Sequence, residues 1–462
     1  MADDEHEQMS DRFEPARCPG PATRDIILKD PGPPAPAVIT EECYDFLGDE
    51  DLSYDVYTDP AIHQQEMERL WPEVWQFACR EEHLPKPGDS YVYDIGDISI
   101  LLVRQRDLGI KAFINSCKHR GMQLRPCGAR GQLKAVRCPF HGFVWGIDGK
   151  FVQAPCQWDF PHIKADEFAL DEVHVGLWEG FVFINMSDNP PPLETYLEVL
   201  PEHFSGWPMS KRHVALHIEK KLPANWKLAQ EAFLEAYHVI ATHPQGLPTA
   251  GDANAQYDVF GENTSRFVHT IGFPSPHLPG ERSQDLILAD LGGEALGLKL
   301  EPGQTAREVF AEHLRKTIGE AMRVDLTNVS ISEMIDSIEY HCFPNFIVFP
   351  GVSLPMVYRF RPDGDDVDSS IFDLFFMALT PDGETSPPAP DPILIDAETS
   401  FTTVPGMSPE LGEIYDQDTD NLIMQTRGLK TSRKKGQTLG NYQEVRIRRV
   451  RKTLDAYLSA CK

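Results

Sequence analysis

Two patterns of apolar and polar positions follow one another along the chain. From Ser90 onward, short runs with the alternation of β-strands are separated by turn signals such as Asp148-Gly149, and they predict a small all-β domain over about residues 75–187. These runs are SYVYDI, ISILLVR, KAFINS, LKAVR, FVW, EVHVGLW and GFVFINM. The proline-rich segment SDNPPP at 187–192 predicts the end of this domain.

After this boundary the pattern predicts a second, mixed domain over residues 188–462, to which residues 41–74 add an N-terminal part. Strand-like runs in it are HVALHIEKKL, NFIVFP, LPMVYRF and SSIFDLFFMAL. Helical patterns run from Trp226 to about Thr242 and over Ala306–Met322, 409–428 and 444–460. Because helices alternate with antiparallel-type strands, we expect an α+β fold.

Three further segments carry weaker signals. Residues 1–40 are polar and proline-rich, and we expect them to form an arm that is mobile or draped over the surface. Asp59 before Pro60 predicts a helix that ends near Leu70, because the carboxylate can cap the first turn and proline is favoured there. Residues 250–306 follow no clear pattern, so we expect loops or insertions.

The composition of the 462 residues is that of a globular protein, with 41% hydrophobic and 25% charged residues, and the length suggests two domains or one large one. A formal net charge of −28 argues against binding a nucleic-acid backbone. No apolar run is long enough for a membrane span, and the acidic N-terminus does not have the pattern of a signal peptide. The cysteines number nine, an odd count that fits a reducing compartment, so we expect a cytoplasmic protein.

The stretch from Cys117 to Phe143 contains two metal-type pairs, Cys117-x-His119 and Cys138-x-x-His141. Each pair offers one thiolate and one imidazole, which is the donor set of an iron–sulfur cluster with two histidines on one iron and two cysteines on the other. A structural zinc site is the alternative. Zinc fingers usually pair cysteine with cysteine and histidine with histidine, so the mixed pairs favour the cluster. The stretch resembles the Rieske motif.

A second group of candidate ligands lies in NWKLAQEAFLEAYHVIATHP at 225–244. Glu235 and His238 are three apart and share a helix face. His238 and His243 are five apart, about 140° round an ideal helix, so they reach one ion only if the helix distorts or ends between them. Pro244 favours such an end. With a distant carboxylate, the histidines would form the facial triad of non-haem Fe(II) oxygenases, whereas the alternative is local hydrogen bonding.

In this order, CKHRG, CPFHGFVW and EAYHVIATHP resemble the large (alpha) subunit of the Rieske non-haem iron ring-hydroxylating oxygenases, over nearly the whole chain past about residue 45. The resemblance implies a small all-β Rieske domain and a larger catalytic domain of helices on an antiparallel sheet, of the helix-grip type. It implies that a [2Fe–2S] cluster is held by Cys117, His119, Cys138 and His141. It also implies that His238 and His243 hold a mononuclear non-haem Fe(II).

The third iron ligand of the resembled family is an aspartate in a late helix. This chain reads IYDQDTDNLIMQTRGL there. The family motif can be aligned to this stretch at Gly428-Leu429 or at Asp420-Asn421. Both alignments place the ligand at Asp418, with Asp416 and Asp420 as rivals. An exposed helix acid is the alternative interpretation for all three aspartates.

Glu235 matches the position of a carboxylate that, in the resembled family, links a cluster histidine of one subunit to an iron histidine of the next. Such a carboxylate fixes the tautomer of the imidazole and shortens the electron route. The resemblance therefore implies a homotrimer.

Several residues depart from the resembled pattern. Glu231 is followed by Ala232, where the family often has asparagine, so a polar group near the iron is absent. Met122 and Phe140 stand where respiratory Rieske proteins carry a bracing disulfide, which favours an oxygenase over a respiratory subunit. The segment between the two cluster pairs is at the long end for the resembled family, and a longer connecting loop would accommodate it.

The function implied by the resemblance is that of a terminal oxygenase. It would use O₂ and electrons from NAD(P)H, delivered by a reductase and possibly a ferredoxin, to monohydroxylate or cis-dihydroxylate an aromatic or other apolar ring. One alternative is a monooxygenase or demethylase acting on a quaternary amine, methoxy-aromatic or terpenoid, and another is a redox carrier or zinc-stabilised binding protein without catalysis. A small beta subunit is a further expected partner.

Overall fold

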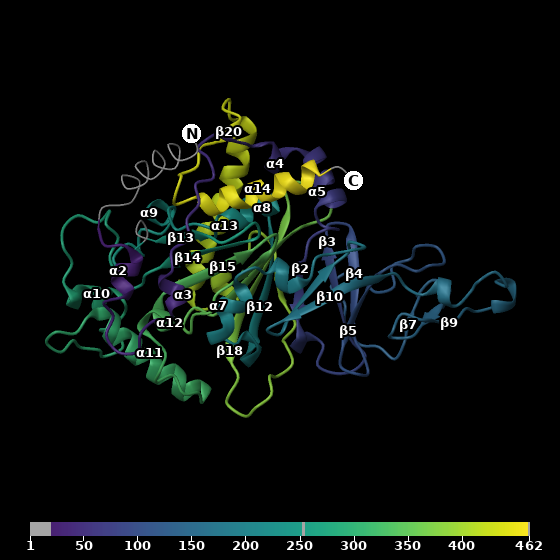
Figure 1. The fold of residues 1–462 in the computed structure, drawn as a ribbon, viewed down its shortest axis with the longest axis horizontal. Coiled ribbons are helices and arrows are strands. Elements are labelled where there is room, and N and C mark those ends of the chain that lie inside the picture. The colour runs from purple at the N-terminus through teal and green to yellow at the C-terminus, as the bar shows by residue number, and fades with distance from the viewer. Residues whose placement is uncertain (1–19, 252–254, 461–462) are drawn as a thin grey trace, which may run out of the picture.

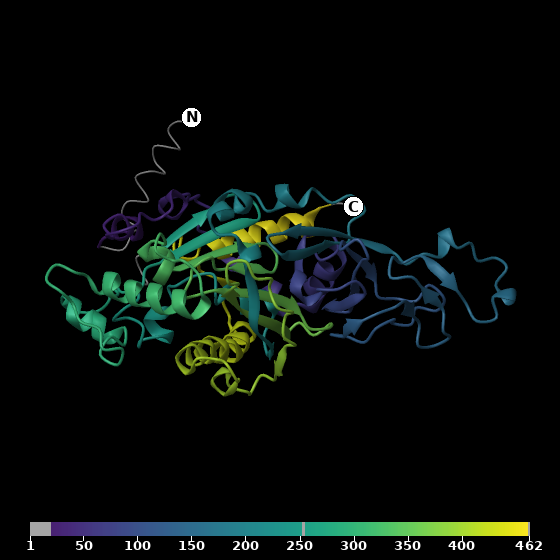
Figure 2. The same cartoon turned by 90° about the horizontal axis from the view of Figure 1, so that it is seen from below.

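The structure is a computed structural model, and it describes residues 20–251 and 255–460 (Figure 1). In both views the strands of the smaller, N-terminal sheet lie to one side of a larger sheet, and most helices gather around the larger one (Figures 1 and 2). The first 19 residues of the expected N-terminal arm lie outside the described residues. None of the described helices is both long and apolar enough to cross a membrane.

The smaller part is an antiparallel seven-stranded sheet in the order β2-β11-β10-β5-β4-β3-β6. Its strands are β2 (Gln76–Arg80), β3 (Asp89–Ile95), β4 (Ile98–Arg104), β5 (Ile110–Ile114), β6 (Arg130–Gln132), β10 (Glu172–Trp178) and β11 (Phe181–Asn185). A separate three-stranded sheet consists of β7 (Val136–Arg137), β8 (Val144–Trp145) and β9 (Phe151–Gln153). Figure 1 shows this small sheet at the outer tip of the molecule, far from the helices α9 and α13.

The larger part is an eight-stranded sheet in the order β13-β14-β15-β16-β17-β18-β12-β19. All neighbours pair antiparallel except β12 and β19, which are parallel. The strands are β12 (Arg212–Leu222), β13 (Gln256–Val259), β14 (Thr264–His269), β15 (Ser337–Cys342), β16 (Phe346–Val348), β17 (Met356–Pro362), β18 (Ser370–Leu379) and β19 (Ile393–Ile395). The mixture of helices with antiparallel sheets confirms the predicted α+β class.

Helices surround the larger sheet: α8 packs against β17 and β18, and α14 packs against β13 and β14. The helices are α2 (Thr23–Ile27), α3 (Ala37–Thr40), α4 (Asp55–Thr58), α5 (Pro60–Arg69), α6 (Leu193–Tyr196), α7 (Leu200–His203), α8 (Trp226–Glu231), α9 (Val239–Thr242), α10 (Gln284–Asp290), α11 (Ala306–Met322), α12 (Ile331–Ile335), α13 (Pro409–Thr431) and α14 (Val445–Ser459). A two-stranded pairing of β1 (Leu52–Ser53) with β20 (Gly436–Gln437) joins distant parts of the chain. As predicted, Asp59 caps α5 by accepting a hydrogen bond from the Ala61 amide.

Aromatic side chains join the two main sheets in one core. The ring of Phe77 on β2 lies 5.3 Å from that of Phe346 and 5.7 Å from that of Phe375, both in the larger part. All three side chains are buried. The relative placement of the two sheets is therefore fixed by packing and not only by the connecting chain.

Three expectations about the local structure were wrong or incomplete. The pattern from Trp226 to Thr242 does not form one helix, because the chain leaves the helix between α8 and α9. Residues 250–306 contain β13, β14 and α10, where we expected loops or insertions. Residues 20–40 pack against the rest of the chain, which fits the draped alternative and not a mobile one, since Ile39 is fully buried and Asp30 pairs with Arg307 at 2.7 Å.

Candidate metal centres

The break between α8 and α9 rearranges the backbone hydrogen bonds of the segment that carries the candidate ligands. In a continuous helix the His238 amide would bond to the carbonyl of Leu234. Here it donates to Glu235 Oε2 at 2.9 Å instead. His238 then becomes the residue before α9 and His243 the residue after it. The short helix thus separates the two imidazoles by a single turn and lets both face the same point.

Two buried side chains from other elements satisfy the backbone groups that this break leaves open. Arg446 of α14 donates to the carbonyl oxygen of Leu234 at 3.0 Å, and the hydroxyl of Tyr257 on β13 accepts a hydrogen bond from the Ala236 amide at 2.9 Å. Arg446 also pairs with Glu339 of β15 at 2.7 Å. Buried backbone groups need such partners, so these contacts stabilise the non-helical path.

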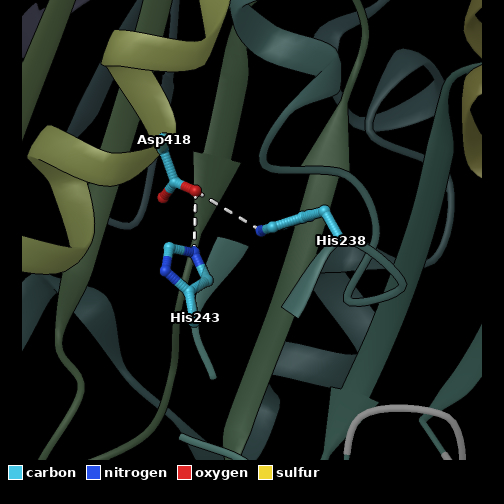
Figure 3. Close-up of side chains that lie close together, drawn as sticks. All are labelled: His238, His243 and Asp418. Carbon is cyan, nitrogen blue, oxygen red and sulfur yellow. Dashed lines mark hydrogen bonds and ion pairs between the residues drawn. The ribbon is translucent and has the colours of Figure 1, made fainter. Parts of the chain in front are cut away.

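The structure brings His238, His243 and Asp418 together (Figure 3). The Nε2 atoms of His238 and His243 lie 3.4 Å and 2.8 Å from the same oxygen, Asp418 Oδ1. Asp418 comes from α13, more than 170 residues later in the chain. Two imidazole nitrogens and one carboxylate oxygen that converge in this way form the donor set of a facial triad, which suits non-haem Fe(II).

The outer nitrogens of both imidazoles have hydrogen-bond partners of their own. His238 Nδ1 lies 2.8 Å from Glu235 Oε1, and His243 Nδ1 lies 2.7 Å from Gln417 Oε1. Both partners are acceptors, so each Nδ1 donates a proton outward, and each Nε2, which faces Asp418 Oδ1, is the nitrogen that a metal ion would bind in place of a proton. This pattern of outer partners is typical of metal-binding histidines.

The two rival aspartates lie elsewhere. Asp416 accepts hydrogen bonds from the Ser400 hydroxyl and from the Phe401 amide at 2.9 Å. Asp420 is exposed on α13. Of the three candidates on this helix, Asp418 alone faces the histidines.

The local charges match a site for a cation. Burial lowers the pKa of His238, but its hydrogen bonds to Asp418 and Glu235 outweigh burial and raise the pKa to about 10. Burial raises the pKa of Asp418, and its bonds to the two histidines more than offset this, so that the net shift is downward. The carboxylates therefore stabilise positive charge at this point, which a bound metal ion would supply in place of the proton.

An apolar cavity of about 250 Å³ opens beside the triad. Residues from three directions line it, including Phe267 and Met356 of the sheet, Val239 of α9 and Ile414 of α13. Its two acidic residues outside the triad, Glu235 and Glu339, already have the partners described above. A cavity with apolar walls next to a metal-binding group is suited to a small, largely apolar substrate.

The two loops with Cys117 and Cys138 have the same backbone hydrogen bonds. The Cys117 amide donates to the Met122 carbonyl and the Gly121 amide donates to the Cys117 carbonyl, both at 2.8 Å. In the second loop, the Cys138 amide donates to the Phe143 carbonyl at 2.8 Å. The Gly142 amide likewise returns to the Cys138 carbonyl at 3.1 Å. The glycines adopt φ of 71° and 76°, a conformation that other residues rarely adopt.

The donor residues of the two loops differ in exposure, and their two imidazole rings are neighbours. Cys117 and Cys138 are buried, whereas His141 is exposed, and the rings of His119 and His141 lie 4.8 Å apart. His119 Nδ1 is buried and has no hydrogen-bond partner among the described residues, as expected for an atom that binds a metal. One tetrahedral zinc would require all four donor atoms within about 4 Å of one another. Within residues 20–251 and 255–460, the triad is the one group of three or more such donors that converges within 4.8 Å.

Several contributors to these sites were not foreseen from the sequence. They are Tyr257, Glu339, Gln417 and Arg446. Gln417 is adjacent to Asp418 and was open to inference, because a polar neighbour of a metal ligand is a frequent hydrogen-bond partner. The other three carry no local signal.

Family models match both parts of the chain. The Rieske [2Fe-2S] domain matches residues 74–164, and the ring hydroxylating alpha subunit (catalytic domain) matches residues 209–460. Both matched ranges contain the donor groups described above. The predicted family is thereby confirmed.

Relatives and solved structures agree with these matches. The chain is 33% identical over 199 residues to the chlorobenzene dioxygenase subunit alpha of Cupriavidus sp. (strain PS12). This aligned region covers 42% of this chain and 44% of the relative. It is 28% identical over 234 residues to the glycine betaine monooxygenase oxygenase subunit of Pseudomonas aeruginosa (strain UCBPP-PA14), covering 49% and 52%. These matches span about half the length of the relatives. In fold, the chain resembles naphthalene 1,2-dioxygenase from Rhodococcus sp., with a TM-score of 0.60, 20% identity and coverage of 89% and 95%. It also resembles a quaternary ammonium Rieske monooxygenase, with a TM-score of 0.62, 17% identity and coverage of 91% and 100%.

Proposed function

Because the chain belongs to the ring-hydroxylating alpha subunits, we propose that it is the terminal oxygenase of a multicomponent Rieske system. In this proposal it uses O₂ and electrons from NAD(P)H to hydroxylate a small aromatic or other apolar ring. The observation that carries the proposal is the convergence of His238, His243 and Asp418 at the wall of an apolar cavity. A facial triad of this kind would leave coordination positions open for O₂ and substrate.

The residues present fit both cofactors of the family. We propose that His238, His243 and Asp418 hold the mononuclear iron. We propose that the [2Fe–2S] cluster is held by Cys117, His119, Cys138 and His141. When bound, the cluster supplies single electrons and the iron supplies the site of O₂ activation.

The chain's own residues orient the ligands and shape the substrate site. The carboxylate of Glu235 holds the proton on His238 Nδ1 and so keeps Nε2 available as a ligand. Gln417 does the same for His243. The apolar walls of the cavity exclude water from the substrate.

The placement of the two centres supports the expected oligomer. The cluster loops adjoin β7 and β8 towards the outer tip, and the triad lies with α9 and α13 at the larger sheet, well away from that tip (Figure 1). We therefore propose that electrons pass from the cluster of one chain to the iron of a neighbouring copy, with Glu235 as the bridge, in a homotrimer. The assignment of residues 75–187 to the cluster domain and of 41–74 with 188–462 to the catalytic domain belongs to the same proposal.

The electron donors in this proposal are a reductase and possibly a ferredoxin, and the system includes a small beta subunit as a further candidate partner. Cytoplasmic location stays a prediction from the sequence. An apolar ring is favoured over a quaternary ammonium substrate because the two acidic cavity residues outside the triad, Glu235 and Glu339, already have partners and leave no free carboxylate to balance a fixed cation. Mono- and dihydroxylation are separated by product analysis.

Metal and product analysis test the proposal together. The purified chain is expected to contain three irons and two acid-labile sulfides, the sum of one cluster and one mononuclear site. With a reductase, NADH and a panel of ring compounds, O₂ consumption is expected to match hydroxylated product. Zinc without sulfide would instead support a structural zinc site, and a loaded protein that oxidises no compound while exchanging electrons would support a redox carrier.

A further inference from the structure

Two tyrosines of the apolar cavity wall are hydrogen-bonded to each other through their hydroxyls. Tyr358 of β17 and Tyr415 of α13 lie with their Oη atoms 2.7 Å apart. Both residues line the cavity. Tyr415 stands three residues before Asp418 on α13, so the two side chains share one helix face. Tyr415 is thereby placed on the face of α13 that carries the proposed iron ligand.

The pair has one more proton than its single hydrogen bond uses. Each hydroxyl has one donor hydrogen, and the bond between them occupies one of the two. Among the described residues, neither hydroxyl has another hydrogen-bond partner. A buried donor of this kind normally finds an acceptor, in the protein, in water or in a ligand.

The surroundings keep both hydroxyls protonated and leave few competing acceptors. Burial raises the pKa of Tyr358 and of Tyr415 well above the ordinary value, so both remain neutral donors near neutral pH. The rings next to them are apolar, since Phe233 lies 5.4 Å and Phe349 5.1 Å from the ring of Tyr358. Glu339, another cavity residue, has Arg446 as its partner.

We propose that the Tyr358–Tyr415 pair recognises one acceptor oxygen on the substrate, and that the preferred substrates are small ring compounds with a ketone or ether oxygen. The inference rests on the proposed function and narrows its substrate class. The spare hydroxyl hydrogen donates to the substrate oxygen, while the apolar walls take the hydrocarbon part. Since Tyr415 is one turn from Asp418, this contact also sets which ring positions face the metal centre.

A matched pair of ligands isolates the contact. Indane and 1-indanone differ by one carbonyl oxygen, and their binding to the anaerobic holoprotein can be compared by calorimetry. Wild-type protein is expected to bind 1-indanone about tenfold more tightly than indane, the upper range for one neutral hydrogen bond. The double variant Tyr358→Phe, Tyr415→Phe is expected to lose this preference while its affinity for indane stays within about twofold.

The single variants and a control define the role further. Each single Tyr→Phe change leaves one hydroxyl without its tyrosine partner, so that hydroxyl can still donate, and at least one single variant is expected to keep most of the preference. Phe349→Leu also alters the cavity wall, but it is expected to change the affinities for both ligands alike. Equal binding of both ligands by wild-type protein, or an unchanged ratio in the double variant, would overturn the proposal.

A second measurement covers the case in which the double variant does not fold. The infrared carbonyl band of 1-indanone bound to wild-type protein is expected at lower frequency than in hexane, because a hydrogen bond weakens the C=O bond. An unshifted band overturns the inference. Oxygenation is a separate readout: a protein that binds 1-indanone through the tyrosines but oxidises neither compound contradicts the proposed function alone.

Discussion

The guanidinium of Arg446 donates to the carbonyl oxygen of Leu234 at 3.0 Å, and this bond links the last long helix to the segment between α8 and α9. One residue further on stands Glu235, which holds His238. Arg446 thus acts as a positioning residue for the triad, although it does not touch the proposed iron ligands in the described contacts.

Replacing Arg446 is therefore expected to weaken the mononuclear iron site and not the cluster. Arg446→Met removes the donor to Leu234 and leaves the buried Glu339 without its partner, a loss of about 3–5 kcal/mol for a buried pair. We expect lower iron content with an unchanged cluster spectrum. Arg449→Met on the same helix is the matched control, because Arg449 contacts a surface acid, Asp45. Equal iron loss in both variants would contradict a positioning role.

Three substitutions on α13 test the assignment of the carboxylate ligand. Asp418→Asn is expected to remove most of the mononuclear iron and all product formation, while acid-labile sulfide stays at two per chain. Asp420→Asn is expected to change neither value, since that side chain is exposed. Asp416→Asn is expected to lower thermal stability through its contacts with Ser400 and Phe401 and to retain iron. Retention of iron by Asp418→Asn would show that another ligand completes the site.

Glu235→Gln tests the orientation of His238. An amide in place of the carboxylate weakens the bond to Nδ1 and allows the ring to turn, so we expect a 10- to 100-fold loss of iron affinity or of turnover. The measurement is iron affinity by competition with a chelator, followed by single-turnover product yield at full iron loading. Glu235→Asp, which keeps the charge, should restore part of both. Unchanged iron affinity together with normal turnover argues against any role for the carboxylate.

Glu231 offers a test by pH. Burial raises its pKa to about 7, and the hydrogen bond from Tyr57 offsets this only in part. The folded-state pKa lies above the unfolded value, so the native fold favours the neutral form. The stabilising contribution is full below about pH 4 and is lost as the pH rises towards 7.

The infrared difference spectrum between wild-type protein and Glu231→Gln is thus expected to contain the band of a protonated carboxyl group. The intensity of this band is expected to fall with a midpoint near pH 7. Tyr57→Phe removes a bond that lowers this pKa and should move the midpoint upward. Loss of the band near pH 4 would show that Glu231 is solvated and has the pKa of an ordinary glutamate.

The proposed ligand residues could be found in the sequence because the donor types of each pair lie close together along the chain. Cys117 and His119 lie two residues apart, and Cys138 and His141 three, so a short stretch reveals each pair of donors. Asp418 required a resemblance, since three acids stand on alternate positions of one helix and spacing alone does not separate them.

The residues that position the ligands were not predictable in this way. The contact between Arg446 and Leu234 spans 212 residues, and that between Tyr358 and Tyr415 spans 57. The period of the segment after Trp226 favours one helix, but contacts with Arg446 and Tyr257 override this local preference. Such tertiary contacts leave no pattern in a single sequence.

The separation of the cluster loops from the triad within one chain has a consequence for mixed assemblies. If electrons pass from the cluster of one chain to the iron of a neighbouring copy, Cys138→Ser disables the electron-donating side of that transfer. Asp418→Asn disables the electron-accepting side. Co-expression of the two variants is then expected to give hybrid rings in which an intact cluster meets an intact iron site, and to recover part of the activity that either variant lacks alone. Separate purification followed by simple mixing should recover less if rings exchange chains slowly. In the proposed assembly, the functional unit is a junction between two copies, so lesions at its two sides are expected to complement each other.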